Sequence, residues 1–319
     1  MAKIAIELEH ALARRREDGT PGLTTPRIIA HGDGWTVGDV VCTCGPQDRP
    51  YEEQHARYAI AIVLAGTFQY RSPSGHRLMT SGSLMLGNHG HCFECAHQHG
   101  EGDRCVSFWY EPDYFERLAS DAGARGSDVR FKAPALPPLR PLSSLVARAG
   151  AGASDVADVP WEEFALTLAS RTVKLAAGVS PGRTGLPLNA EARVSQAVRT
   201  IDRHSHAALP LGQLARQVGL SPYHFLRTFK SLTGVTPHQY VLRARLRDAA
   251  WRLAGGTDKI LDVALDTGFG DVSNFNRAFR AEFGASPRVF RRLSDARDVA
   301  RACDSISSNR SGKPACFRK

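Results

Sequence analysis

The sequence lacks the segments that would carry a chain into or across a membrane. No apolar run approaches the 18 or more residues that a membrane-spanning helix needs. Residues 1–18 contain no hydrophobic stretch of the kind found in secretory signals, and their alternating pattern indicates a short amphipathic helix. The seven cysteines are an odd number, and nothing suggests export. We therefore expect a cytoplasmic protein with reduced thiols and no membrane partner.

The first part of the chain has no excess of positive charge, and the excess lies in the last part. Residues 1–189 carry 19 basic and 21 acidic side chains, whereas residues 190–294 carry 16 and 8. The whole chain of 319 residues has a net charge of +9. A basic surface attracts phosphate groups in a salt-dependent way, whatever the base sequence. A nucleic-acid partner is therefore expected for residues 190–294 and not for residues 1–189.

Residues 211–292 contain the same unit twice. Apolar and glycine positions of the first copy recur 49 residues later, and after one extra residue in the turn they recur 50 residues later. Two copies of this length predict two small modules in tandem rather than a solenoid. The matched pairs include Leu211 with Ile260, Gly219 with Gly268, Phe225 with Phe275, Phe229 with Phe279, and Gly234 with Gly284.

Each copy has the pattern of two helices joined by a tight turn. From Leu211, apolar residues at i, i+3, i+4 and i+7 form one face of a short helix, and Gly219 permits the turn. Ser221 followed by Pro222 is typical of the cap and first position of a second helix, which we expect to cover residues 222–233. In the second copy the expected cap is Asp271 or Ser273. The expected core residues are Phe225 and Phe229 in the first copy and Phe275 and Phe279 in the second.

The second helix of each copy carries polar side chains opposite its phenylalanines. Arg and Lys can bind guanine, Asn can bind adenine, and hydroxyl groups can bind phosphates. In one copy alone, an ordinary solvent-exposed helix face would show the same polar residues. The basic positions recur in the second copy, Arg227 as Arg277 and Lys230 as Arg280, which favours a DNA-reading face. The predicted DNA-contacting residues are Ser221, Tyr223, His224, Arg227, Thr228, Lys230, Ser273, Asn274, Asn276, Arg277 and Arg280.

Residues 260–291 resemble the signature of the AraC/XylS family of bacterial transcription regulators. The resemblance extends over residues 191–293 and implies that a long helix joins two modules whose second helices enter the major groove of double-stranded DNA. Residues 238–254 would give roughly 25 Å of helix, of the order of one turn of DNA. The resemblance to the AraC/XylS family also implies an effector, a homodimer, and RNA polymerase as partner if the output is activation. The matching residues are Ala264, Gly268, Phe269, Phe275, Arg277, Phe279, Phe283, Gly284, Ser286 and Pro287.

Between residues 35 and 110 the chain has the texture of short strands and turns. Runs rich in β-branched and aromatic residues alternate with turn signals, which predicts an all-β sandwich or barrel. The AraC/XylS resemblance implies a cupin-like sensor barrel here. Expected strands cover 58–63, 67–70, 76–79, 84–86 and 105–110, and one expected turn is Ala65-Gly66.

Cysteine and histidine side chains gather between the expected strands at 84–86 and 105–110. Thiolates and imidazoles at such spacing suit Zn, Fe or Cu, and the candidate metal ligands are Cys92, Cys95, His97, His99 and Cys105. A turn near Phe93 would be needed to bring Cys92 and Cys95 to one ion. A plain structural core and a reactive-thiol sensor remain open as alternatives. Cys42, Cys44 and His55 lie earlier in the same region, and no cofactor is expected for DNA binding itself.

The domain organisation follows from these patterns. We expect a cupin-like sensor domain at 1–130, a helical and proline-rich linker at 131–188, a DNA-binding domain at 189–294, and a disordered basic tail at 295–319. The apolar face of a helix near 161–177 is either a dimer surface or packed on its own domain.

The favoured function is a sequence-specific DNA-binding transcription regulator, without enzyme activity, controlled by a metal, redox signal or small molecule at the N-terminal barrel. One alternative is an oxygenase-like cupin metalloenzyme fused to a DNA-binding module. Another is a constitutive DNA-binding protein whose barrel only dimerises.

Overall fold

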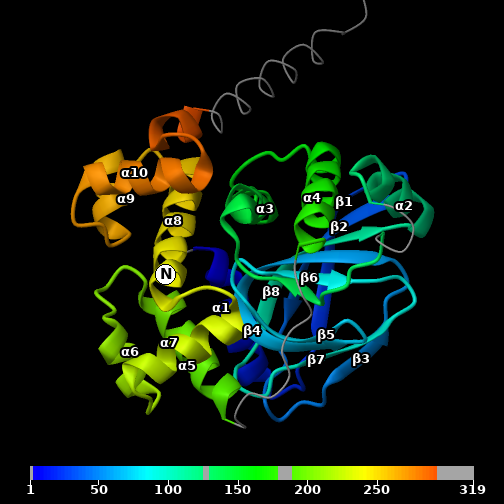
Figure 1. The fold of residues 1–319 in the computed structure, drawn as a ribbon, viewed down its shortest axis with the longest axis horizontal. Coiled ribbons are helices and arrows are strands. Elements are labelled where there is room, and N and C mark those ends of the chain that lie inside the picture. The colour runs from blue at the N-terminus through cyan, green and yellow to red at the C-terminus, as the bar shows by residue number, and fades with distance from the viewer. Residues whose placement is uncertain (1–2, 125–128, 179–188, 293–319) are drawn as a thin grey trace, which may run out of the picture.

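The computed structural model describes residues 3–124, 129–178 and 189–292, and the chain divides into a β domain and a helical domain (Figure 1). Helix α1 (Lys3–Asp18) precedes the strands, and helices α5 to α10 lie within residues 189–292. The expected architecture, β-rich in the first half and all-α in the second, is confirmed. In these described ranges no helix combines the length and the apolar character that crossing a membrane requires.

The β domain consists of two antiparallel sheets that share the long strand β4 (Tyr58–Ser72). In the first sheet the order is β1 (Thr24–Gly32), β2 (Trp35–Cys42), β8 (Asp103–Tyr110), β4, β6 (Leu84–Gly87) and β9 (Ala135–Leu136). The second sheet pairs β3 (Tyr51–Gln54) with β7 (Cys92–Ala96), and pairs β7 and β5 (Gly75–Thr80) with β4. Within the described strands the ladder does not close into a ring, since β1, β3 and β9 each have one neighbour. The likeness to a cupin therefore stays a prediction.

Strand β4 bends where a turn was expected. The turn predicted at Ala65-Gly66 is wrong, because the strand continues through a bulge between Val63 and Ala65 opposite β8. A bulge bends its strand, so the first part of β4 pairs with β6 and β8 and the second part with β5 and β7. Gly66 permits a close approach here, since a Cβ atom on it would lie 2.3 Å from the Gly102 carbonyl oxygen.

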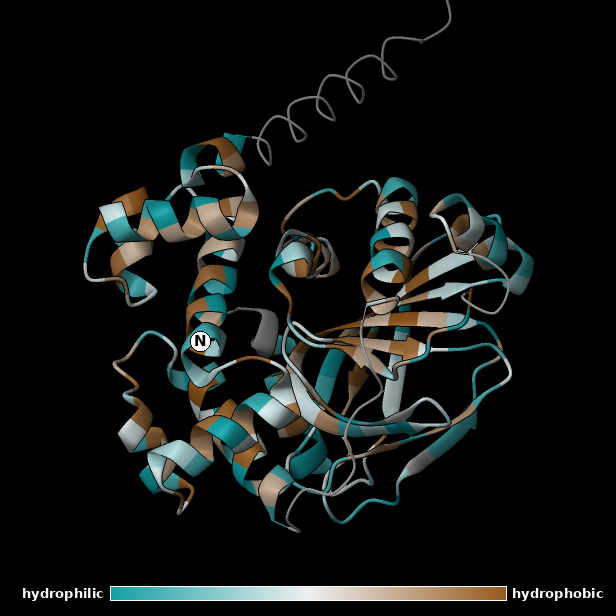
Figure 2. Ribbon diagram, viewed as in Figure 1, coloured by the Kyte–Doolittle hydropathy of each residue, from teal (hydrophilic) through white to brown (hydrophobic). Residues whose placement is uncertain are grey.

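Helices α2 (Pro112–Asp121), α3 (Ser143–Ala153) and α4 (Trp161–Ala176) pack against the first sheet, whose strands are largely hydrophobic (Figure 2). Helix α4 buries Phe164, whose ring stacks on that of Phe108 at a centroid distance of 5.4 Å. The apolar face of α4 therefore packs on its own domain, which was one of the two interpretations left open. The short 3-10 helix η2 (Arg140–Leu142) leads into α3. The domain boundaries stay predictions, and residues 179–188 and the tail at 295–319 lie outside the described residues.

The helical domain begins with α5 (Ala190–His204) and contains both predicted modules. The first is α6 (Leu211–Gln217) with α7 (Pro222–Thr233), and the second is α9 (Ile260–Asp266) with α10 (Val272–Phe283). Helix α8 (Pro237–Gly255) runs between them and confirms the expected long connection (Figure 1). Its 19 residues give a length of about 28 Å.

Each half of α8 belongs to the core of a different module. Tyr240 and Val241 pack with α5, α6 and α7, whereas Leu246 and Leu253 pack with α9 and α10. The two small cores are therefore held at the two ends of one helix, which fixes the separation of the modules.

Candidate functional sites: a nucleic-acid interface and a buried pocket

The second helices of the two modules begin with the same kind of cap. The Ser221 hydroxyl accepts a hydrogen bond from the backbone N–H of His224 at 3.4 Å. Asp271 Oδ1 accepts one from the backbone N–H of Asn274 at 2.7 Å, so the cap of the second copy is Asp271 rather than Ser273. Each cap satisfies one N–H group that the first turn of a helix leaves without an intrahelical partner.

The buried sides and the ends of these two helices also match. Both helices end at a glycine with left-handed backbone, Gly234 at φ +77° and Gly284 at φ +76°, a conformation that other residues rarely adopt. The repeat in the sequence is therefore a repeat in geometry. The predicted core residues are fully buried: Phe225, Phe229, Phe275 and Phe279.

The predicted DNA-contacting residues lie on the opposite, solvent-facing sides of α7 and α10. All of them are exposed except Thr228, which is half-buried. Tyr223 is 68% exposed, a large fraction for an aromatic side chain. Arg277 donates a hydrogen bond to Asn274 Oδ1 at 3.2 Å, so two polar side chains of α10 form one surface group. These positions are free to meet a ligand as large as DNA, and the individual contacts remain predictions.

A pocket of about 270 Å³ lies in the β domain, lined by strands of both sheets. Cys95, His97 and Cys105 of the predicted metal ligands line it. Cys92 does not, because β7 stays straight through Phe93 and residues three apart on a strand point to opposite faces. His99 lies in the loop after β7 and does not line the pocket either.

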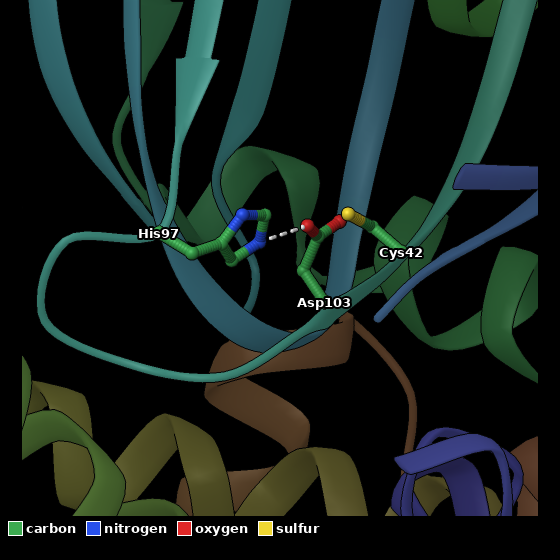
Figure 3. A group of neighbouring side chains, drawn as sticks. All are labelled: Cys42, His97 and Asp103. Carbon is green, nitrogen blue, oxygen red and sulfur yellow. Dashed lines mark hydrogen bonds and ion pairs between the residues drawn. The ribbon is translucent and has the colours of Figure 1, made fainter. Parts of the chain in front are cut away.

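Three side chains in this pocket come together closely: Cys42, His97 and Asp103 (Figure 3). All are buried, and one potential ligand atom of each lies within 4.8 Å of the other two. His97 Nε2 is 2.8 Å from Asp103 Oδ1, and Asp103 Oδ2 accepts a hydrogen bond from Cys105 Sγ at 3.2 Å. Cys42 and Asp103 are direct partners in the β2–β8 ladder, and His97 immediately follows β7.

Burial and Asp103 favour the neutral thiol form of two pocket cysteines, Cys95 and Cys105. Burial raises the pKa of Cys95 and of Cys105, and the charge of Asp103 raises both further. A hydrogen bond between Cys42 and Cys44 raises the pKa of Cys42 and lowers that of Cys44. Burial by itself would lower the pKa of His97, but its hydrogen bond to Asp103 and the charge of Asp103 raise it overall.

His55 forms another polar part of the pocket wall. Its Nε2 lies 2.9 Å from the Tyr70 hydroxyl, and its ring stacks on Phe93 at a centroid distance of 4.0 Å. Burial, with a smaller contribution from the charge of His91, lowers the pKa of His55 to about 4. This histidine is therefore neutral at physiological pH.

Sequence patterns pointed to this region but missed Asp103 as a partner of Cys42. The two residues are far apart in sequence, and only the antiparallel register of β2 with β8 brings them together. A second buried pair in the same ladder was also missed. Arg104 Nε and Nη2 bind the two oxygens of Asp39, each at 2.9 Å, and Nη2 also donates to the Ala153 carbonyl of α3 at 3.2 Å.

The pocket and the helical domain meet through the loop at residues 98–102, which joins His97 to Asp103 and arcs past the helices (Figure 3). Arg199 of α5 donates a hydrogen bond to the His99 carbonyl in this loop. Next to it, Ser81 donates to Asp202 Oδ2 at 2.9 Å, and Tyr240 of α8 donates to the same oxygen at 3.4 Å. A cavity of about 400 Å³ lies at this junction.

Comparison with known proteins connects the chain to transcription regulators. A family model described as a helix-turn-helix domain matches residues 214–293. The HTH-type transcriptional activator RhaS of Salmonella dublin is 31% identical over 198 residues, which cover 59% of this chain and 68% of that protein. RhaS of Klebsiella pneumoniae is 35% identical over 108 residues, or 34% of this chain and 39% of that protein.

Solved structures of regulators align less closely. An AraC-type DNA-binding domain-containing regulator from Chromobacterium violaceum has 26% identity and a TM-score of 0.32, covering 34% of this chain and 96% of that one. ToxT from Vibrio cholerae has 13% identity and a TM-score of 0.33, covering 82% and 99%. TM-scores this low do not establish a shared fold, and the family is assigned from the sequence matches. With a repeated helix-turn-helix unit, a matching family model and a relative 31% identical over two thirds of its length, the chain belongs to the AraC/XylS family of DNA-binding transcription regulators.

Proposed function

We propose that the β domain senses an effector in its pocket and that the affinity of the helical domain for DNA depends on whether the pocket is occupied. The observation behind this proposal is the loop at 98–102. It begins and ends at two pocket residues, His97 and Asp103, and its His99 carbonyl accepts a hydrogen bond from Arg199 of α5. Helix α5 in turn contributes Val194 and Ile201 to the core of the first module.

The contact between loop and helix gives a direct test that needs no knowledge of the effector. DNA that the full chain binds is selected from a randomised library, and its dissociation constant is measured for Arg199→Ala and for Arg203→Ala. Both changes remove one positive charge from α5, but Arg203 is exposed and has no hydrogen bond to the loop among those described. We expect Arg199→Ala to shift the dissociation constant at least fivefold, the lower end of typical coupling between sites. Equal effects of the two substitutions on the dissociation constant would contradict the proposal.

For DNA reading we propose that the exposed faces of α7 and α10 enter two successive segments of the major groove. The length of α8 supports this, since about 28 Å is of the order of one helical turn of DNA. Arg227 and Arg277 are the first candidates for base contacts, because an arginine fork can bind guanine O6 and N7 together.

The related RhaS proteins are named activators, so we further propose activation, with RNA polymerase as partner and a homodimer as the active form. Transcription in vitro from the selected DNA tests the first point, and sedimentation velocity tests the dimer. A fall in transcription on adding the protein contradicts activation, and a monomer on DNA contradicts the dimer.

We also propose that the pocket senses and does not catalyse. The thiols of Cys95 and Cys105 are held protonated by burial and by Asp103, and a protonated thiol is a poor nucleophile. Oxygen uptake by the metal-loaded protein above that of the metal ion alone would contradict this.

A further inference from the structure

The donor set at the bottom of the β-domain pocket is that of a transition-metal site. Cys42 offers sulfur, His97 offers nitrogen and Asp103 offers oxygen, and all three side chains are buried. Mixed sulfur, nitrogen and oxygen donors suit Zn²⁺, whereas Mg²⁺ and Ca²⁺ prefer oxygen alone. Two further thiols border the cluster: Cys105 hydrogen-bonds to Asp103, and Cys44 to Cys42.

The geometry needs little adjustment to hold one ion. Zinc–ligand bonds of about 2.0–2.3 Å place two donors of a tetrahedral site roughly 3.5 Å apart. The donor atoms of Cys42, His97 and Asp103 already lie within 4.8 Å of one another. Side-chain rotations that move atoms by about an ångström would bring them to one centre. The backbone positions of Cys42 and Asp103 need no change, because the two residues are already paired across the β2–β8 ladder.

A zinc ion would also bring little net charge into this cluster. Asp103 is buried with His97 and with the thiols of Cys42 and Cys105, and uncompensated charge is costly in such a buried site. Zinc binding would release the thiol proton of Cys42 to solvent, and one proton from His97 where its imidazole is doubly protonated. The net gain of positive charge is then smaller than the charge of the ion.

We propose that Cys42, His97 and Asp103 bind one zinc ion, with the fourth position facing the pocket. This deepens the proposed function, on which it rests for one consequence: the ion would be the effector that the β domain senses. Two of the ligands, His97 and Asp103, are the two ends of the loop that contacts Arg199. Binding of both residues to one ion would fix the ends of that loop. The loop contacts α5, so its position would affect the position of α5 and of the first module.

The first test is zinc binding by the full chain after removal of metal. Titration against a chromogenic chelator should give one zinc per chain. Cys42→Ser and His97→Ala should each weaken binding at least tenfold, because each removes a ligand. Cys92→Ser and His99→Ala are the matched controls, since both residues belong to the same Cys/His-rich stretch but lie outside the pocket, and they should change nothing. Absence of zinc binding, or equal binding by all four variants, would overturn the assignment.

Cobalt substitution guards against variants that simply fail to fold. Co²⁺ bound to a thiolate absorbs by sulfur-to-metal charge transfer, and this band should be present in the wild type and in Cys92→Ser and absent in Cys42→Ser. In Asp103→Asn, which keeps the shape of the side chain, the band should persist while zinc affinity falls. A band unaffected by Cys42→Ser would contradict the assignment even if every variant folds.

Measurements of DNA binding test the proposed role of zinc as effector separately from the existence of the zinc site. If zinc binds at the three residues and the dissociation constant for the selected DNA does not change, the site stands and its role as effector fails. If zinc does not bind, the site is wrong, while the Arg199→Ala comparison still tests coupling between pocket and helices independently.

Discussion

The β domain and the helical domain both bury apolar side chains, but the β domain also buries ionisable groups. The β domain encloses an arginine–aspartate pair, a histidine–aspartate pair and several thiols, including those of Cys42 and Cys105. The helical domain encloses phenylalanines in both modules, and its helices α7 and α10 expose Arg227, Asn276 and Arg277 on their other side. Buried polar groups cost free energy unless they are paired, and in the two pairs of the β domain they are joined by hydrogen bonds.

This difference separates two roles within one chain. The helical domain presents chemistry outward to a ligand larger than itself, and its interior only has to hold the presenting helices. The β domain directs its polar groups inward, towards a pocket of about 270 Å³. Substitutions inside the helical domain should therefore act on stability, and those inside the β domain on stability, pH response and ligand binding.

The largest effect is expected in the aromatic interior of the second module. Phe275 is fully buried between Phe269 and Phe279, and Phe275→Ala should lower the free energy of unfolding by about 3–5 kcal/mol. Leu265→Ala, on the neighbouring helix α9 and 49% exposed, should cost less than about 1 kcal/mol. Urea denaturation followed by circular dichroism measures both. Similar losses for the two variants would show that the module has no specific aromatic core.

The second-largest loss of stability is expected when the buried ion pair of the β domain, Asp39 with Arg104, is broken. Arg104→Met leaves Asp39 buried without its main partner and should cost about 3–4 kcal/mol. The double variant Asp39→Leu/Arg104→Met should recover a large part of that loss, because it removes both charges. The unfolding transition of the β domain in urea gives these values. A double variant less stable than Arg104→Met would mean that the pair stabilises the domain beyond compensating its own charges.

The third effect depends on pH and belongs to His55. Its pKa is about 4 in the folded chain against 6.5 for a free histidine, so above pH 6.5 it is neutral in both states. As the pH falls from 6.5 towards 4, the unfolded chain takes up a proton that the folded chain does not, and folding loses up to about 3 kcal/mol. In His55→Phe this loss should disappear, while the Tyr70 hydroxyl keeps its hydrogen bond to the Leu86 carbonyl.

The control for this experiment is the difference between wild type and variant at each pH, since other groups also titrate. Urea titrations at pH 7, 6, 5 and 4 should show the two proteins diverging steadily. A constant difference across the series would mean that His55 protonates equally well in the folded chain.

The smallest expected change in free energy lies on the outer surface of the helical domain. Arg227→Ala and Arg277→Ala should each weaken binding to the selected DNA by about 1–3 kcal/mol and leave the stability of the chain unchanged. A base contact would relax the sequence preference at one position, and a phosphate contact would reduce the salt dependence. Arg140→Ala, an exposed charge outside the helical domain, is the control. Losses no greater than that of Arg140→Ala would contradict a reading role for these helices.

Much of the helical domain could be predicted from the sequence because helices are local structures. The spacing of Phe225 and Phe229 and the cap at Ser221 each act within a few residues, and both are found as expected. Duplication of the unit strengthened every one of these signals. The choice between Asp271 and Ser273 as cap was left open because both residue types cap helices equally well.

The β-domain pocket could be predicted only in outline because strand pairing is not local. The Cys/His-rich stretch indicated the region, but Cys92 and Cys95 point to opposite faces of β7, which a sequence pattern without the register cannot settle. The partnership of Cys42 with Asp103 depends on the β2–β8 register, and the long β4 depends on a bulge that resembled a turn at Ala65-Gly66.

The measurement that tests the central claim most directly is the dissociation constant of the full chain for its selected DNA, with and without one equivalent of zinc, in the wild type and in Arg199→Ala. If the inward chemistry of the β domain controls the outward chemistry of the helical domain, zinc should shift the wild-type constant at least fivefold, and Arg199→Ala should reduce that shift. A wild-type protein that binds zinc at Cys42, His97 and Asp103 and holds DNA equally well with and without it would contradict the account.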